Sequence, residues 1–101
     1  MQLRRVGLQV EEGKQLGESL RQWRVLLGMS QELAAKRANI SLPTVRRIER
    51  GDPGVKMASF LALIAVLNLT ERFTAAADPL ETDLGRMRAH LLSRQRARRT
   101  S

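Results

Sequence analysis

The chain has 101 residues, which is enough for one domain and too few for two. Hydrophobic residues make up 43% of it, so we expect a real core, but aromatic residues are scarce at 3% and no short stretches of alternating aliphatic residues occur, which argues against a β-sheet protein. The formal net charge of +8 favours a polyanionic partner, and the lack of cysteine excludes disulfides, cysteine zinc sites and thiol nucleophiles.

The first predicted element is a helix from about Glu11 to Leu27. Its large apolar residues recur at i, i+4, i+7 and i+11, and this single stripe is typical of the buried face of a helix. The stripe consists of Leu16, Leu20, Trp23 and Leu27. Gly28 is expected to end the helix in the left-handed conformation.

Two short helices are predicted next, with about three residues between them. Ser30 is placed to N-cap a helix over 31–38, and Ser41 to N-cap a second helix over 42–50. Asn39 lies between them and tolerates the left-handed backbone that a tight turn between helices requires. The segment therefore predicts a compact helix pair.

A fourth helix is expected from about Val55 to Leu67, after the turn sequence Gly51 to Gly54. It is apolar on most of its circumference, which is typical of a buried helix, so we expect it to be the central helix of a bundle. Its large apolar residues are Met57, Phe60, Leu61, Leu63, Ile64, Val66 and Leu67.

The C-terminal third predicts a short fifth helix, capped by Thr70 and ending near Ala77, and then a sixth helix to about residue 93. Asp78 is the expected cap of the last helix, Pro79 its first residue and Glu81 its capping-box acid. This helix carries a second apolar stripe, Leu80, Leu84, Met87 and Leu91. The prediction is a five-helix domain over 10–77 and an extension over 78–101 that ends in a basic tail.

The helix pair over 29–51 carries the functional signal. Ala35 is small enough for the two helices to cross closely, and Ile40, Val45 and Ile48 are the inward-facing apolar positions. This spacing suits a steep crossing in which the second helix protrudes. The protruding face would then consist of Leu42, Pro43, Thr44, Arg46, Arg47 and Arg50.

These elements resemble the lambda-repressor/Cro-like (XRE) helix-turn-helix family, from about Leu16 to Leu69. Ser-Gln opens the first helix of the pair, an alanine follows four residues after the glutamine, Ile-Ser precedes the second helix, and V-x-x-I-E-R-G closes it. The sequence GDPGV followed by an apolar helix is similar to the HipB-type antitoxin subgroup, whose members pair with HipA-like kinases. The chain departs from the family pattern at Leu33, where an exposed acid is usual, and at Ala34, where leucine is usual.

The resemblance implies an all-α DNA-binding domain that binds a palindromic operator as a homodimer. It also implies that Gln31 bonds to a phosphate and braces the recognition helix, and that Arg24 forms an ion pair with Glu49. That pair is partly expected from position, because Glu49 is the lone acid of an arginine-rich helix and adjoins the buried Ile48.

The chemistry of the protruding face predicts how the DNA contacts are shared. Arg46 and Arg47 can make the bidentate guanine contact, Leu42 and Pro43 can only touch thymine methyls, and Thr44 can do either. Arg50 and Lys56 flank the motif and are expected at phosphates. The predicted DNA-binding residues are Gln31, Ser41, Leu42, Pro43, Thr44, Arg46, Arg47, Arg50 and Lys56.

Several alternatives stay open beside this interpretation. We expect the stripe of Leu80, Leu84, Met87 and Leu91 to bury against the second subunit of the dimer, although it could also pack on its own domain. The arginine-rich end from Arg86 could be a solvated tail or a DNA contact. The domain could also be an interaction module without DNA binding, and the C-terminal helix could lie on a membrane surface.

No enzyme, cofactor or metal site is predicted, since no phosphate-binding loop or nucleophile–base arrangement occurs and His90 has no second candidate ligand. The longest apolar run, 60–67, is too short to span a bilayer and no secretory signal is seen, so we expect a cytoplasmic protein at the nucleoid. The preferred hypothesis is a HipB-like antitoxin that represses its own operon and binds a HipA-like Ser/Thr kinase toxin. The alternative is a stand-alone or phage-type repressor.

Overall fold

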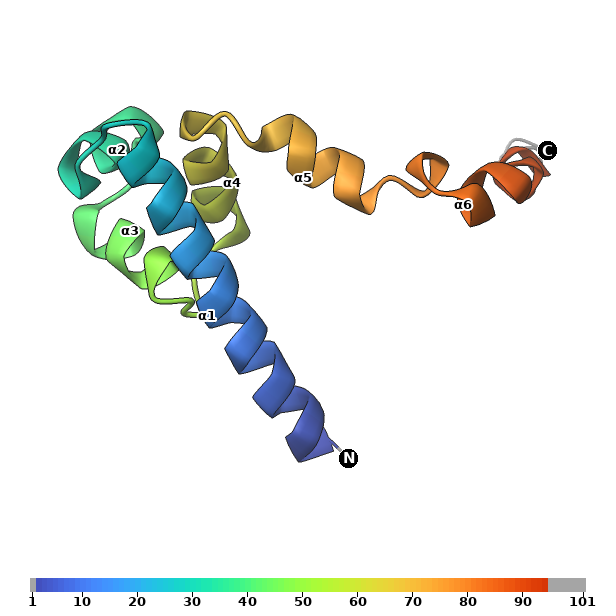
Figure 1. Cartoon of the computed structure of the whole chain (residues 1–101), viewed down its shortest axis with the longest axis horizontal. Coiled ribbons are helices and arrows are strands. Elements are labelled where there is room, and N and C mark those ends of the chain that lie inside the picture. Colours follow the sequence, from blue (N-terminus) through green and yellow to red (C-terminus); the bar gives the residue numbers. More distant parts are fainter. Residues whose placement is uncertain (1, 95–101) are drawn as a thin grey trace. The chain divides into compact units, whose positions relative to one another are not determined.

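The computed structural model describes the backbone of residues 2–94 and the side chains of residues 9–94 (Figure 1). All regular structure in this range is helical, with no strand, which confirms the predicted all-α class. The helices are α1 (Gln2–Leu26), α2 (Gln31–Ala38), α3 (Leu42–Glu49), α4 (Met57–Val66), α5 (Thr70–Ala77), a 3₁₀ turn η1 (Pro79–Glu81) and α6 (Asp83–Met87). Residues 90–94 are helical as well. Among these described helices, none has both the length and the apolarity needed to cross a bilayer.

The chain divides into two compact units, Met1–Thr70 and Glu71–Ser101. The boundary falls after Thr70, whereas the end of the first domain was predicted at residue 77. The difference arises because the buried core ends with Leu69, which is 4% exposed, and α5 contributes no buried residue. Thr70 was expected to cap α5 from the position before the helix, but it is the first residue of α5.

Helix α1 differs from its prediction in both its start and its buried face. It begins at Gln2 and not near Glu11, because residues 2–10 contain no proline and no N-capping residue at which a helix would start afresh. Gly28 follows its end with a φ of 72°. The stripe was expected to be core, but only Leu20 is fully buried, while Leu16 and Leu27 are 38% and 42% exposed. The reason is that the face turned to the rest of the unit is centred on Gly17 and Leu20, one position away from Leu16.

Helices α2 and α3 pack on α4, and α1 packs mainly on α3. The core of the unit is completed by Met29, Ala34, Ala35, Val45, Ile48, Leu63, Ile64, Leu67 and Leu69. The expectation that α4 is buried on all sides was wrong, because Met57 is 75% and Leu61 is 50% exposed. Because α1 packs on α3, it leaves the face of α4 that carries Met57 and Leu61 open to solvent.

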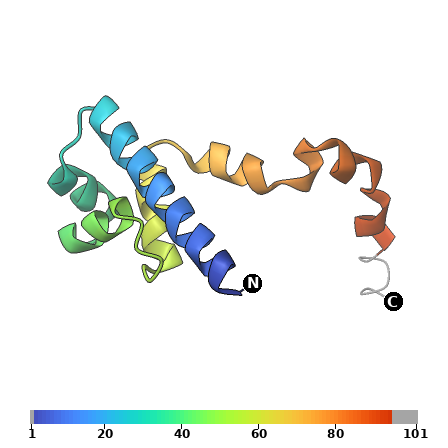
Figure 2. The same ribbon diagram turned by 60° about the horizontal axis from the view of Figure 1, so that its bottom comes forward.

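A backbone contact fixes where α1 crosses the end of α3, as can be followed in Figures 1 and 2. A Cβ on Gly17 would lie 2.6 Å from the carbonyl oxygens of Ile48 and Glu49. Gly51 has a φ of 79°, and a Cβ there would lie 2.5 Å from the carbonyl oxygen of Gly13. Only glycine fits such an approach, so the three glycines set the position of α3 against α1.

The second unit is not the continuous helix that was predicted from residue 78 to about 93. Asp78 does cap a helical start, accepting a 2.9 Å hydrogen bond from the amide of Leu80, but only a 3₁₀ turn follows. Thr82 is extended (ψ 154°) and caps α6 by accepting a 3.0 Å bond from the amide of Gly85. A competing cap and a glycine of low helix propensity explain the break.

The second apolar stripe is therefore distributed over three short helical pieces. All four of its residues are exposed: Leu80 (46%), Leu84 (61%), Met87 (75%) and Leu91 (45%). The basic tail beyond residue 94 lies outside the described residues.

Candidate nucleic-acid interface

The helix pair α2–α3 is built by local capping, as expected from the sequence. The hydroxyl of Ser30 accepts a hydrogen bond from the amide of Leu33 at 3.0 Å, and that of Ser41 accepts one from the amide of Thr44 at 3.2 Å. Asn39 ends α2 with a φ of 55° in the left-handed region. Helix α2 has the predicted bounds, and α3 ends one residue early because Arg50 is its C-cap.

Helix α3 has a buried face and a protruding face. Val45 and Ile48 are 0% and 3% exposed, and Glu49 joins them at 8%. The opposite face carries the exposed residues Pro43, Arg46 and Arg50 and the half-exposed residues Leu42, Thr44 and Arg47. The inward-facing Val45 and Ile48 therefore leave every predicted residue of the protruding face at least partly open to solvent.

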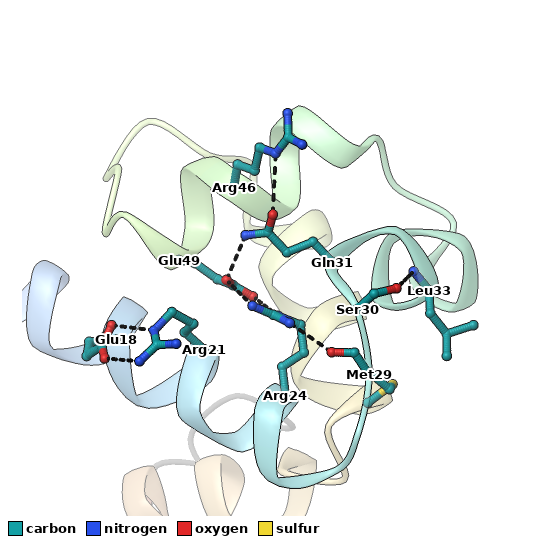
Figure 3. Close-up of polar contacts among 9 residues, drawn as sticks. All are labelled: Glu18, Arg21, Arg24, Met29, Ser30, Gln31, Leu33, Arg46 and Glu49. Carbon is teal, nitrogen blue, oxygen red and sulfur yellow. Dashed lines mark hydrogen bonds and ion pairs between the residues drawn. The ribbon is translucent and has the colours of Figure 1, made fainter.

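Glu49 is the centre of a largely buried polar network (Figure 3). The guanidinium of Arg24 forms an ion pair with it, with Nε 2.7 Å from Oε2 and Nη2 3.1 Å from Oε1. Arg24 also donates from Nη1 to the carbonyl of Met29 at 2.8 Å. The side chains of Arg24 and Glu49 are only 11% and 5% exposed, so a bidentate pair joins α1, the α1–α2 loop and α3 inside the protein.

Gln31 extends this network to the protruding face of α3. Its Nε2 donates to Oε1 of Glu49 at 3.0 Å, and its Oε1 accepts a longer bond of 3.4 Å from Nε of Arg46 (Figure 3). The amide of Gln31 is thus oriented by an internal partner, and Arg46 is steered by it. Because the contact uses Nε, the terminal Nη groups of Arg46 stay available for an outside acceptor.

Arg47 is held differently from Arg46. Its Nε lies 2.8 Å from Oδ2 of Asp52, while Oδ1 of Asp52 accepts a 2.8 Å bond from the amide of Gly54. The hydrogen bond from Arg47 lowers the pKa of the Asp52 carboxyl most, and the bond from the amide of Gly54 lowers this pKa further. The sequence predicts only a turn over 51–54, so Asp52 is a site residue that was not predicted, although an acid five residues after an arginine in a tight turn is a signal for such a pair.

The remaining predicted residues lie around this face. Ser41 is the N-cap of α3. Its hydroxyl also forms a 2.7 Å hydrogen bond with the hydroxyl of Thr44. Lys56 precedes α4 as its N-cap residue and is exposed. With Arg46, Arg47 and Arg50, Lys56 makes the surroundings of α3 basic, with Asp52 as the acid among them.

A family model described as Helix-turn-helix matches residues 20–73, which is just over half of the chain. The chain belongs to the helix-turn-helix family. The matched segment runs from Leu20 in α1 to Phe73 in α5 and includes the α2–α3 pair with its capping serines. No curated protein matches the chain. No solved structure matches it either.

Membership makes this helix-turn-helix protein a DNA-binding transcription regulator and supports the lambda-repressor/Cro-like resemblance. In such a motif the second helix enters the major groove, and its N-terminal side chains contact base edges. The second helix of the pair in this protein is α3. Within the described residues, no group of three or more histidines and acids lies close enough together to bind a metal ion.

Proposed function

We propose that this regulator binds a palindromic operator as a homodimer and represses transcription, with Arg46 as its main base-reading residue. The observation that supports this best is the way in which Arg46 is held. Its Nε is steered by Gln31, Gln31 is fixed by Glu49, and Glu49 is paired with Arg24. An arginine that is pre-oriented in this way, with free Nη groups, suits the bidentate contact to guanine.

The other DNA contacts follow from the chemistry of each side chain. Leu42 and Pro43 offer apolar contact to thymine methyls, and Thr44 adds a hydroxyl at the start of α3. Arg50 and Lys56 are exposed cations at the edge of the motif and suit phosphates. Gln31 is the first residue of α2, where a phosphate would meet the helix dipole, and its bond to Glu49 orients it there.

The dimer is proposed from the second unit. Leu80, Leu84, Met87 and Leu91 are all exposed within one short stretch of the chain. Exposed large apolar residues concentrated in this way typically mark an interface. Pairing two copies would hold two α3 helices about one turn of DNA apart, roughly 34 Å, so that two weak half-sites are bound at once. Such a regulator would act at the nucleoid.

The proposed biological role is that of a HipB-like antitoxin that represses its own operon and binds a HipA-like Ser/Thr kinase toxin. This rests on the sequence GDPGV and the apolar α4 that follows it. Co-expression with the product of a neighbouring kinase-like reading frame tests the proposal. A complex in gel filtration supports the antitoxin role, while the absence of such a frame or complex favours a stand-alone repressor.

Sequence-specific binding is tested by selection from a random pool of DNA duplexes with the full-length protein. We expect enrichment of a palindrome with half-sites centred about 10 base pairs apart. Hydroxyl-radical footprinting of the enriched duplex should protect both half-sites on one face. A pool that stays random after repeated rounds contradicts the proposal.

The dimer interface is tested by Leu84→Asp in the full-length chain, because a charge within an apolar contact opposes association. The matched control is Leu26→Asp, which alters the last residue of α1, 78% exposed and outside the second unit. Sedimentation should show that Leu84→Asp shifts the protein to monomer and that Leu26→Asp does not. A Leu84→Asp protein that remains dimeric places the interface elsewhere.

A further inference from the structure

Two neighbouring arginines on α3, Arg46 and Arg47, are held by different partners. Arg46 is steered by Gln31, which belongs to the helix that precedes α3. Arg47 is bound by Asp52, which belongs to the turn that follows α3. The two guanidinium groups are therefore restrained by different elements of the fold.

Asp52 is built into the fold more firmly than an ordinary surface partner. Its backbone amide donates to the carbonyl of Arg47 at 3.0 Å, so the two residues are already joined through the main chain. Its Oδ1 accepts from the amide of Gly54 and its Oδ2 from Nε of Arg47, both at 2.8 Å. The preceding residue, Gly51, has a φ of 79° and lies against Gly13 of α1, which fixes where the turn begins.

This arrangement affects what Arg47 can offer to DNA. A guanidinium paired with a carboxylate brings no net charge to a phosphate, and binding DNA would require the pair to open or a phosphate to lie beside Asp52. The affinity of a protein for DNA of any sequence depends chiefly on how many phosphates its cations neutralise. An unpaired Arg47 would add such a contact without adding sequence information.

We infer that Asp52 limits the sequence-independent affinity of the DNA-binding surface, because it holds Arg47 against the turn after α3 and neutralises its charge, while base reading is left to Arg46. The inference rests on the proposed base-reading role of Arg46. Asp52 acts through Arg47 and touches no base itself. Its removal therefore strengthens binding to DNA of any sequence by about the same factor.

The test uses the full-length protein with two duplexes of equal length: the duplex enriched by the wild type and a scrambled version. Asp52→Asn should bind the scrambled duplex roughly threefold to tenfold more tightly at about 0.1 M salt, since one more phosphate contact steepens the salt dependence by about 0.9. Binding to the enriched duplex should improve by a similar factor, so the ratio of the two affinities stays the same. Glu71→Gln, which removes an exposed acid from the first turn of α5, outside the α2–α3 pair, is the charge-matched control and should change either affinity by less than about twofold.

The double variant Arg47→Ala/Asp52→Asn separates the two ways in which Asp52 could act. If Asp52 acts by restraining Arg47, then Asp52→Asn does not raise the affinity for either duplex when Arg47 is already replaced by alanine. The same gain with and without Arg47, or no gain in either, overturns the inference. A wild-type protein that binds both duplexes equally instead contradicts the proposed function, so the two failures can be told apart.

Discussion

The helix pair α2–α3 and the segment from Pro79 to residue 94 were predicted from the same kinds of signal, and they folded differently. Both carry N-capping residues and apolar residues at helical spacing. In the first, Ser30, Asn39 and Ser41 give the bounds of α2 and the start of α3 as predicted. In the second, a correctly placed cap at Asp78 opens only the turn η1 before the chain breaks at Thr82.

The difference lies in whether the signals agree with one another. In α2–α3 the caps, the turn and the buried residues all indicate the same two helices, and the network around Glu49 ties them together. In the second unit a further cap at Thr82 and a glycine at 85 conflict with the stripe, and no residue of η1 or α6 is buried to outweigh them. An apolar stripe alone does not decide a helix when local bonds compete with it.

The comparison predicts that ion pairs in the two units differ greatly in their contribution to stability. Glu49→Ala leaves Arg24 nearly buried without its carboxylate and removes the acceptor of Gln31, so we expect a loss of about 3–5 kcal/mol in the free energy of unfolding. The control is Asp83→Ala, which breaks the pair with Arg86 in α6, where Asp83 is 98% exposed. Chemical denaturation followed by circular dichroism measures both; equal losses would contradict the comparison.

A smaller loss is expected at the crossing of α1 and α3. Gly17→Ala places a methyl group 2.6 Å from two carbonyl oxygens, and relieving it must shift one helix. Overpacking of this kind costs about 1–3 kcal/mol. Ser19→Ala, on an exposed position of the same helix, is the control and should be neutral in thermal unfolding. A Gly17→Ala protein as stable as the wild type shows that the crossing adapts freely.

The smallest effect, and the one that sharpens the comparison, is expected at Gly85. A Cβ there meets the carbonyl of Pro79 only while η1 folds back on α6. Alanine is also favoured over glycine inside a helix by about 1 kcal/mol. Gly85→Ala combined with Thr82→Ala should therefore make the segment a continuous helix, seen as a stronger signal at 222 nm. An unchanged spectrum would mean that the break does not depend on these two residues.

The sequence was sufficient to predict those features of the fold that depend only on residues adjacent in the chain. The caps of α2 and α3, the turn residues Gly28, Asn39 and Gly51, and the inward positions Val45 and Ile48 depend on local geometry and periodicity. The Arg24–Glu49 pair was expected partly from the position of Glu49 and partly from the family resemblance, and the structure contains it.

The rest depends on how helices are placed in space, which periodicity does not encode. Leu16 belongs to a regular stripe but lies beside the face that Gly17 turns toward α3, so it stays partly exposed. Met57 and Leu61 are exposed because α1 packs on α3 and not over them. The pairing of Arg47 with Asp52 needed the path of the turn, which composition alone does not give.

The measurement that tests the account most directly is the discrimination of the enriched duplex from the scrambled duplex by Arg46→Ala. Loss of a bidentate base contact should cost about 1–3 kcal/mol on the enriched duplex and little on the scrambled one. Arg37→Ala is the control, because it removes the same charge from α2 and not from α3. Nη1 of Arg37 lies 3.5 Å from the sulfur of Met29. If Arg46→Ala retains the wild-type ratio of affinities, α3 does not read DNA through Arg46 and the central claim is wrong.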